Sequence, residues 1–406
     1  MSFIPFPPPG GYINAIRKSS EALRIASGIS ITPEHVKRLI YSEAFVGSFK
    51  RVSKHHGLAM PLSFSSSLDE LNFLSVLSLL NFASGYRVPL HAQTGRGAWD
   101  SIRALAFSLF ITSTSGEGDL LSSRGLQAIN ASKIAEFMGI NMHAERPHES
   151  IPGVIVGELG GPLYELVNLI ASVLNETGHI LVSGGYVNLG SFVAEALNEG
   201  GKVADKEAAV EVVLERLVRA FPGFRDMYEV NGQPIYCFKK ALFLIHGISI
   251  RFGSLAPPPF PIPSTSNLPV FSDNVLPSLL IHLGVLDLSA NPSLSSLFPQ
   301  AGSDQTVISL LGPPPPKTVT GGPKPLPKEG PKLTVDQSYI FRAASINACD
   351  IIIEAARSVE GTENEDVEWI SRITLPDLDM WLWAVAKDRR DYRALERFAM
   401  TDTVYF

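Results

Sequence analysis

The chain has 406 residues, of which 45% are hydrophobic, and its formal net charge is −6. This length allows one large domain or two with a sizeable buried core, and the negative charge argues against polymeric DNA or RNA as a main partner. The two cysteines, Cys237 and Cys349, are too few for a disulfide framework or a cysteine-rich zinc site and fit a reducing compartment. Because no signal peptide and no long uninterrupted apolar run is visible, we expect a cytoplasmic globular protein that contacts no membrane.

Helical patterns dominate the chain after a proline-rich start. Residues 1–11 predict a flexible tail, followed by one domain at 12–406. Helices are expected at 13–27, at 34–54 after the Thr32-Pro33 start signal, and at 65–86 and 97–111, where apolar residues cover most faces. Further helices are expected at 131–139, 161–177, 188–198, 206–220, 235–249, 274–285, 338–358 and 374–388. The clearest of few strand signals lies at 152–158, so the fold class is mostly α.

Two proline-rich segments interrupt this helical pattern. Residues 255–269, "LAPPPFPIPSTSNLP", cannot be helical through their proline run. Residues 301–335 include "GPPPPKTVTGGPKPLPKEGPK", have little apolar content and predict a disordered insert. Both lie between helices that must still pack together, so we interpret them as excursions from a single domain.

Sequence motifs for the common cofactors are missing. The chain has no GxGxxG after a strand, Walker A loop, HExxH, CxxC pair or EF-hand loop, so we expect neither a cofactor nor a metal. Cys237 stands in the apolar stretch "IYCFKKALFLI", which is typical of a buried thiol that fills space.

A lysine pair and an aspartate are the charged residues that stand out in apolar surroundings. Lys239 and Lys240 open an apolar helix, and Asp273 follows in "VFSDNVLP", just before another. Consecutive helical residues point about 100° apart, so one of the two lysines must face nearer the core. A buried carboxylate and a cation suit cleavage of an N-glycosidic bond, because the carboxylate stabilises oxocarbenium character. The simpler alternatives are a helix cap for Asp273 and a surface position for Lys239.

Several short stretches, taken in order, resemble the queuosine salvage protein family. They are "LLNF" (79–82), "LNETG" (174–178), "GSF" (190–192), "FPGFRD" (221–226), "FKKA" (238–241), "FSDNVLP" (271–277), "HLG" (282–284), "LDMWLW" (378–383) and the terminal Tyr405-Phe406. The resemblance implies a single helical domain similar to helix-hairpin-helix DNA glycosylases. It also implies hydrolysis of queuosine 5′-monophosphate to queuine, a 7-deazaguanine, and ribose 5-phosphate, for salvage to tRNA modification. The family's lysine and aspartate fall on Lys239 and Asp273.

The same resemblance suggests residues that bind the substrate. The early Asn-Phe motif falls on Asn81 and Phe82, and the C-terminal Leu-Asp motif falls on Asp379. Phe82 and Trp383 would stack on the flat base, while Asn81 and Asp379 would bind its polar edge, since guanine-like N–H groups donate hydrogen bonds. Core packing is the alternative for the two aromatic residues, and helix-start capping is the alternative for Asp379.

The chain departs from the family directly after the aspartate. Asn274 and Val275 stand where the family usually has Tyr-Arg, so a phosphate contact would have to come from elsewhere. The sequence offers four cations for this role, namely Arg87, Arg96, Arg225 and Lys240.

Two other functions stay open at the level of sequence. One is a non-catalytic helical interaction protein that uses its proline-rich segments as ligands. The other is a DNA glycosylase that acts on flipped bases.

Overall fold

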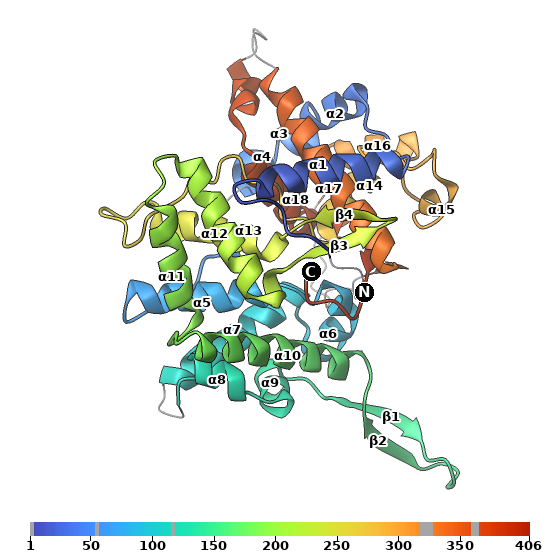
Figure 1. Ribbon diagram of the computed structural model, residues 1–406. Coiled ribbons are helices and arrows are strands. Elements are labelled where there is room, and N and C mark those ends of the chain that lie inside the picture. The colour runs from blue at the N-terminus through green and yellow to red at the C-terminus, as the bar shows by residue number, and fades with distance from the viewer. Residues whose placement is uncertain (1–3, 53–56, 115–117, 317–327, 359–364) are drawn as a thin grey trace.

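The computed structural model describes residues 4–52, 57–114, 118–316, 328–358 and 365–406 (Figure 1). Within these residues the protein is mostly helical, and its strands form three separate two-stranded sheets, which confirms the mostly α class. One contiguous hydrophobic core reaches from Tyr12 in the first helix to Phe406 at the end of the chain.

The N-terminal helices are short because polar caps and turns divide them. Thr32 accepts a hydrogen bond from the His35 N–H and Pro33 occupies the first turn, as the sequence predicts. Ser42 begins a new helix within the segment 34–54, so the single helix expected there is wrong. The helices are α1 (Tyr12–Ala26), α2 (Pro33–Ile40), α3 (Glu43–Val46) and α4 (Phe49–Val52).

Residues 4–11 differ from the flexible tail that the composition predicts. Phe6 lies against the guanidinium groups of Arg219 and Arg225, and the carbonyl of Pro5 accepts a hydrogen bond from Tyr236. These contacts tie the described part of the tail to the helical body.

The central helix α5 (Ser67–Leu79) is apolar all round and buried from Leu71 onward. It ends at Leu79, with Leu80 as its C-cap, and does not reach Tyr86, because Ala83 turns the chain with a positive φ of 88°. The segments that follow are the 3₁₀ turn η2 (Ser84–Tyr86), α6 (Arg87–Thr94) and α7 (Ala98–Thr114). The chain therefore leaves α5 in a tight turn that carries Asn81 and Phe82.

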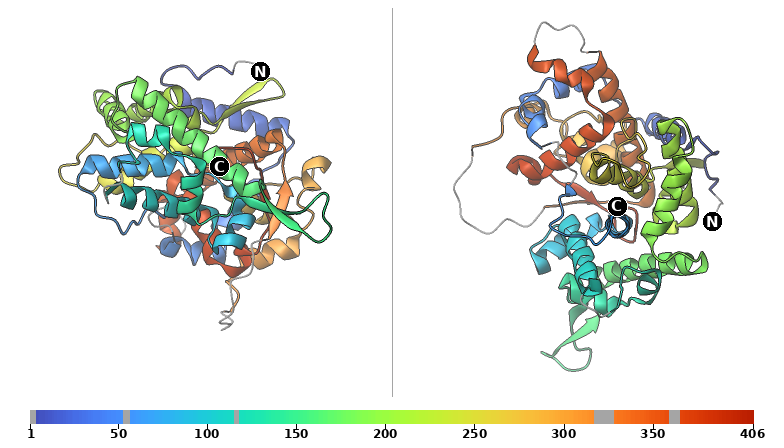
Figure 2. Two further views of the ribbon diagram at one scale, coloured as in Figure 1. Left: turned by 90° about the horizontal axis from the view of Figure 1, so that it is seen from below. Right: turned by 90° about the vertical axis from the view of Figure 1, so that its left-hand side faces the viewer.

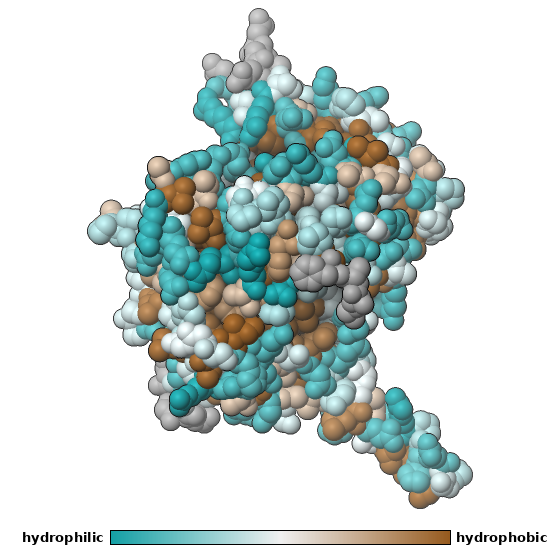
Figure 3. Space-filling model, viewed as in Figure 1, coloured by the Kyte–Doolittle hydropathy of each residue, from teal (hydrophilic) through white to brown (hydrophobic). Residues whose placement is uncertain are grey.

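A lower layer of helices packs around α10 (Pro162–Ser183), which contacts α8 (Ser123–Ala128) and α9 (Ala131–Met138). In the described residues α10 is the one helix with the length and apolarity of a membrane-spanning segment, and half of its most apolar window is buried in the fold. The expected strand near 152–158 is found as β2 (Ile155–Leu159), paired antiparallel with β1 (His143–Pro147). This hairpin extends away from the body (Figures 1 and 2) and exposes apolar side chains (Figure 3), which include Ile151, Val154, Ile155 and Leu159.

The middle of the chain forms α11 (Leu189–Gly200), α12 (Lys206–Ala220), the 3₁₀ turn η3 (Pro222–Phe224), the hairpin β3 (Met227–Val230) and β4 (Gln233–Tyr236), α13 (Lys239–Phe252) and α14 (Val275–His282). The helix expected at 235–249 therefore begins four residues later, since 235–236 belong to β4. Residues 255–269 form a loop, as the proline run predicts.

The C-terminal part surrounds α17 (Val335–Arg357), along which α1 packs (Figure 1). The expected disorder of 301–335 is wrong for two stretches: α16 (Asp304–Leu311) buries Val307 and Leu310, and β5 (Glu329–Lys332) pairs with β6 (Arg397–Ala399). Residues 317–327 of that segment lie outside the described residues. The remaining elements are α15 (Pro292–Ser295), η4 (Glu365–Arg372), α18 (Leu375–Asp388) and α19 (Arg390–Arg393).

Candidate active site

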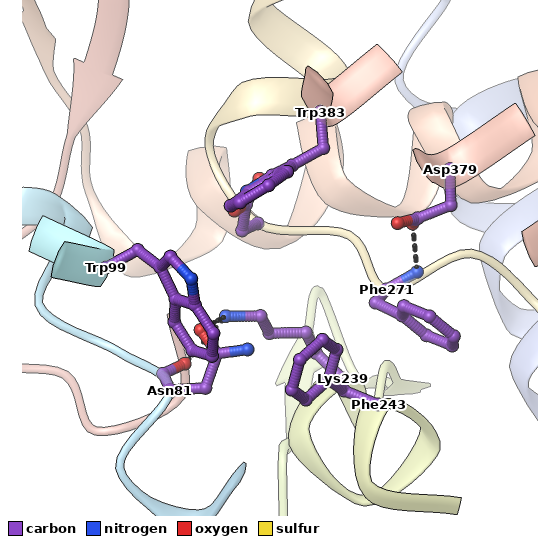
Figure 4. Close-up of a pocket in the computed structure, with 8 residues that line it drawn as sticks. Asn81, Trp99, Lys239, Phe243, Phe271, Asp379 and Trp383 are labelled. Carbon is purple, nitrogen blue, oxygen red and sulfur yellow. Dashed lines mark hydrogen bonds between the residues drawn. The ribbon is translucent and has the colours of Figure 1, made fainter. Parts of the chain in front are cut away.

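A pocket forms where the turn after α5 meets α7, α13, the 271–273 segment and α18 (Figure 4). Eight side chains line it, namely Asn81, Trp99, Lys239, Phe243, Phe271, Asp273, Asp379 and Trp383. Five of the seven site residues that the sequence suggested are therefore brought together, although Asn81 and Trp383 are 302 positions apart in the chain. Phe82 and Lys240 do not line the pocket.

Lys239 is the first residue of α13, and its amine reaches across to the turn after α5 (Figure 4). The Nζ donates to the Asn81 carbonyl at 2.6 Å and to Asn81 Oδ1 at 3.2 Å. An ammonium group has three donors, and no partner for the third is found in the described part of the chain. Burial lowers the pKa of Lys239 to about 8, and the nearby Asp273 carboxylate opposes this shift.

Lys240 takes the buried position behind the pocket. Its Nζ donates to the carbonyl of Leu79 at 2.7 Å and lies 5.0 Å from the ring centroid of Phe82. Burial, with Lys239 adding repulsion, holds its pKa well below the ordinary value. Lys240 and Phe82 therefore support the turn that carries Asn81.

Strained backbone flanks both sides of this contact. Phe238, directly before Lys239, has a positive φ of 46°, and Ala83, two residues after Asn81, has 88°. Such conformations are costly for residues with a side chain, and they concentrate at functional sites. The turn and the start of α13 are held in one unusual arrangement that brings the amine to the pocket.

Asp273 is 8% exposed and lies just ahead of α14. Its Oδ1 accepts a hydrogen bond from the Val275 N–H at 2.6 Å. Among the described residues no donor to Oδ2 is found. The carboxylate thus stabilises the start of the helix with one oxygen and leaves the other available in the pocket.

A buried ion pair fixes the backbone around both charged residues. Asp226 and Arg342 are fully buried and form two hydrogen bonds with each other, one of them at 2.9 Å. The Asp226 carboxylate also accepts from the backbone N–H of Lys239 at 3.2 Å, and the Arg342 Nε donates to the carbonyl of Ser272 at 3.0 Å. The pair therefore connects the first residue of α13 to the residue before Asp273.

Asp379 occupies the pocket face of α18, not its cap. Thr374 and Asp377 form the capping box of this helix, so the capping alternative applies to Asp377. Asp379 is 3% exposed, and its Oδ2 accepts from the Phe271 N–H at 2.7 Å (Figure 4).

Four aromatic side chains form the walls, and the sequence suggested only Trp383 among them. Phe243 follows Lys239 by one turn of α13, so the two share a helix face, and Phe271 lies two residues before Asp273 in the irregular segment ahead of α14. That spacing was a usable signal. Trp99 was missed because it stands on a separate helix, and its ring meets Trp383 edge-on at a centroid distance of 6.4 Å.

The pocket is tight in this conformation. The space among its side chains, including the mouth, is about 350 Å³, and only about 30 Å³ of it admits the centre of a water molecule. The buried indole N–H of Trp99 has no hydrogen-bond partner in the described residues. Trp99 and Trp383 are both only half-buried.

Other chemistries find little support in the described residues. No cluster of three histidine, cysteine or acidic side chains is suited to hold a metal there. Burial raises the pKa of the Cys237 thiol to about 12, so this cysteine is not an activated nucleophile.

Comparison with known proteins points to one family. A family model described as "Queuosine salvage protein" matches residues 162–297, a region that contains Lys239 and Asp273. Queuosine 5′-phosphate N-glycosylase/hydrolase of Sphaerobacter thermophilus is 25% identical over 215 residues, which are 53% of this chain and 56% of that protein. The Mus musculus protein of the same name is 28% identical over 235 residues, 58% of this chain and 56% of that protein. The chain thus matches just over half the length of these curated relatives, and together the matches confirm its resemblance to the queuosine salvage protein family.

Proposed function

We propose that the protein hydrolyses the N-glycosidic bond of queuosine 5′-monophosphate and releases queuine and ribose 5-phosphate. The observation that carries this proposal is the pair of buried charged groups, Lys239 and Asp273, on one aromatic-walled pocket. The names of the two relatives support the substrate.

The reaction breaks the bond between C1′ of the ribose and the base nitrogen, and water supplies the new oxygen on C1′. As the bond lengthens, positive charge develops on the ribose, and a carboxylate in a site of low dielectric stabilises it. Asp273 is assigned this role, either by direct attack or by activating the water with its free oxygen. A 7-deazaguanine has no N7 to protonate, so more of the barrier must be lowered at the ribose.

Lys239 and the remaining lining residues act on the departing base and its surroundings. The ammonium group of Lys239 would stabilise negative charge in the pocket. Trp99 and Trp383 provide flat apolar surfaces for a purine-like ring, while Asn81 and Asp379 offer acceptors for its N–H groups. Phe82 would act indirectly, by supporting Asn81.

The other expectations about the protein stay proposals. A fold of the helix-hairpin-helix DNA glycosylase type is proposed for the helical body. Cytoplasmic location is also proposed, and the two free, buried cysteines are compatible with it. A small nucleotide is the proposed partner, with no polymeric nucleic acid.

The test is incubation of the purified full chain with queuosine 5′-monophosphate, followed by chromatography of the released base. We expect release by the wild type and nearly none by Asp273→Asn, with a melting temperature that falls little. Asp377→Asn is the matched control, because it changes an aspartate that only caps α18.

Each outcome separates the candidate functions. Normal turnover by Asp273→Asn would mean that Asp273 only supports the start of α14, because an asparagine oxygen can also accept the Val275 N–H. Release from flipped or damaged bases in duplex DNA, but not from the monomer, would favour the DNA glycosylase. No release from either substrate would favour the interaction protein.

A further inference from the structure

Two cations next to the pocket-lining Trp383 have no ion-pair partner among the described residues. Lys387 follows Trp383 by one turn of α18, and its Nζ lies 3.3 Å from the centroid of the Trp383 ring. Arg397 stands on β6, and its Nη2 donates at 2.7 Å to the carbonyl of Ala386, the residue before Lys387. The two positive side chains are therefore neighbours on the side of the pocket that carries Trp383.

The protein holds Arg397 in place from the helix that begins after Asp273. The Asn274 side chain donates to the carbonyl of Phe398 at 2.9 Å, and Ser278 on α14 accepts from the Phe398 N–H at 3.3 Å. These bonds fix β6 against α14, so the position of Arg397 is tied to the position of the Asp273 carboxylate.

The electrostatic surroundings of these cations favour an anion. Neither Lys387 nor Arg397 forms a salt bridge in the described residues. Loss of solvent around its amine lowers the pKa of Lys387; Asp100 and Asp273 oppose this shift, and Arg397 and Arg103 add to it. Burial likewise lowers the pKa of Arg397, with only Asp273 opposing. Like charges crowded in this way are stabilised when an anion lies between them.

We propose that Lys387 and Arg397 form the subsite for the phosphate of a nucleoside 5′-monophosphate. A guanidinium and an ammonium group are the side chains that bind a phosphate dianion best. Lys387 covers the ring of the pocket-lining Trp383, and both cations interact electrostatically with Asp273, so they are close enough to hold a 5′-phosphate when C1′ lies beside that carboxylate. The identity of the rest of the ligand rests on the function proposed above.

The four cations that the sequence offered are less suited to this role. The Lys240 amine already donates to the Leu79 carbonyl. The Arg225 side chain donates to backbone carbonyls of α12 and lies against the ring of Phe6. Arg96 is exposed on the loop before α7. Burial lowers the pKa of Arg87, and the nearby positive charge of Arg397 lowers it further. The Arg87 side chain already donates a hydrogen bond to the carbonyl of Lys328.

The experiment measures kcat/KM for queuosine 5′-monophosphate and for queuosine, the nucleoside without phosphate. In Lys387→Gln and Arg397→Gln we expect the value for the nucleotide to fall by about tenfold or more, the loss of one charge-assisted contact. The value for the nucleoside should change little. Arg397→Lys keeps the charge and should retain part of the preference. Lys50→Gln is the matched control, since Lys50 is also a lysine over a tryptophan ring, at 5.4 Å from Trp369 and on an element that does not line the pocket.

An unchanged ratio of the two values in Lys387→Gln would overturn the subsite. Should the wild type hydrolyse neither compound, the proposed function fails and a binding measurement decides the subsite alone. Calorimetric titration with ribose 5-phosphate and with ribose is then expected to show tighter binding of the phosphorylated sugar by the wild type only. Equal binding by wild type and Lys387→Gln, or no binding by either, would overturn the proposal.

Discussion

Asp273 shows how one side chain can satisfy two demands. A carboxylate in an apolar segment is costly unless it is hydrogen-bonded, and the Val275 N–H supplies such a bond at the start of α14. This bond uses one oxygen only. The N-cap of α14 is Asn274, so the capping alternative for Asp273 is wrong in position, although its Oδ1 still binds the first N–H of the helix. Because Oδ2 is left for chemistry, support of the helix start and catalysis do not exclude each other here.

Lys239 gives a prediction for the pH dependence of activity. Burial lowers its pKa to about 8, so the amine is charged below that pH and neutral above it. If the ammonium form is needed, kcat/KM should be level up to about pH 8 and then fall by about tenfold per pH unit, because this parameter reports the free enzyme. The substrate phosphate, whose second pKa is about 6, is almost fully ionised above about pH 7 and therefore adds no step to the alkaline fall.

The control for this profile keeps the charge and removes the titration. Lys239→Arg should retain part of the activity and lose the alkaline fall, since a guanidinium stays protonated far above pH 8. Lys239→Met should be slow at every pH. An alkaline fall near pH 8 that persists in Lys239→Arg would assign it to another group, such as Lys387.

At the scale of elements, the buried Asp226–Arg342 pair acts as a clamp. It joins α17, which carries Arg342, to the start of α13 and to the segment before Asp273. Burying two charges yields little net stability, but removing one partner leaves the other unpaired in the core. The clamp is therefore better explained by positioning than by stability.

Arg342→Met is expected to lower the free energy of unfolding by about 3–5 kcal/mol, measured by urea denaturation, and to reduce turnover. Asp226→Asn should also be destabilising. The double variant should lose less than the sum of the two singles, because neither charge is then left alone.

The matched control is the Arg251–Glu70 pair, which joins the last turn of α13 to the first turn of α5 and is partly exposed. Arg251→Met should cost about 1 kcal/mol or less and leave kcat unchanged. Strictly additive losses in the Asp226 and Arg342 cycle would contradict the clamp.

The sequence predicts helices better than it predicts where they end. Caps such as Thr32-Pro33 and Thr374 are local, and the structure has them where expected. The true start of α13 depends on Asp226, which lies 13 residues earlier and binds the Lys239 N–H. The end of α5 likewise depends on Lys240. Such long-range bonds leave no periodic signal in the residues that they terminate.

For the whole molecule, the site combines residues that no local pattern connects. Asn81, Asp273 and Asp379 could be predicted because ordered motifs of a family run through them. Trp99, Lys387 and Arg397 could not, since each acquires its place only when distant elements pack together. Lys239 and Asp273 could be predicted from the sequence, whereas most of the aromatic wall residues and the two neighbouring cations could be identified only in the folded structure.

The packing of distant parts of the chain against one another predicts how the protein unfolds. Tyr12 and Phe406 belong to one hydrophobic core, α1 packs along α17, and the Phe406 ring lies 4.6 Å from the Arg342 guanidinium. The buried hydrophobic residues of the described chain form one cluster. We therefore expect one cooperative thermal transition by calorimetry, coincident with the loss of helix by circular dichroism.

Phe406→Ala should lower the free energy of unfolding in this single transition by about 3 kcal/mol, whereas Ile155→Ser, on the exposed hairpin, should leave it within about 0.5 kcal/mol of the wild-type value. Two separate transitions, only one of them sensitive to Phe406→Ala, would show instead that the expected single domain at 12–406 is two independent units.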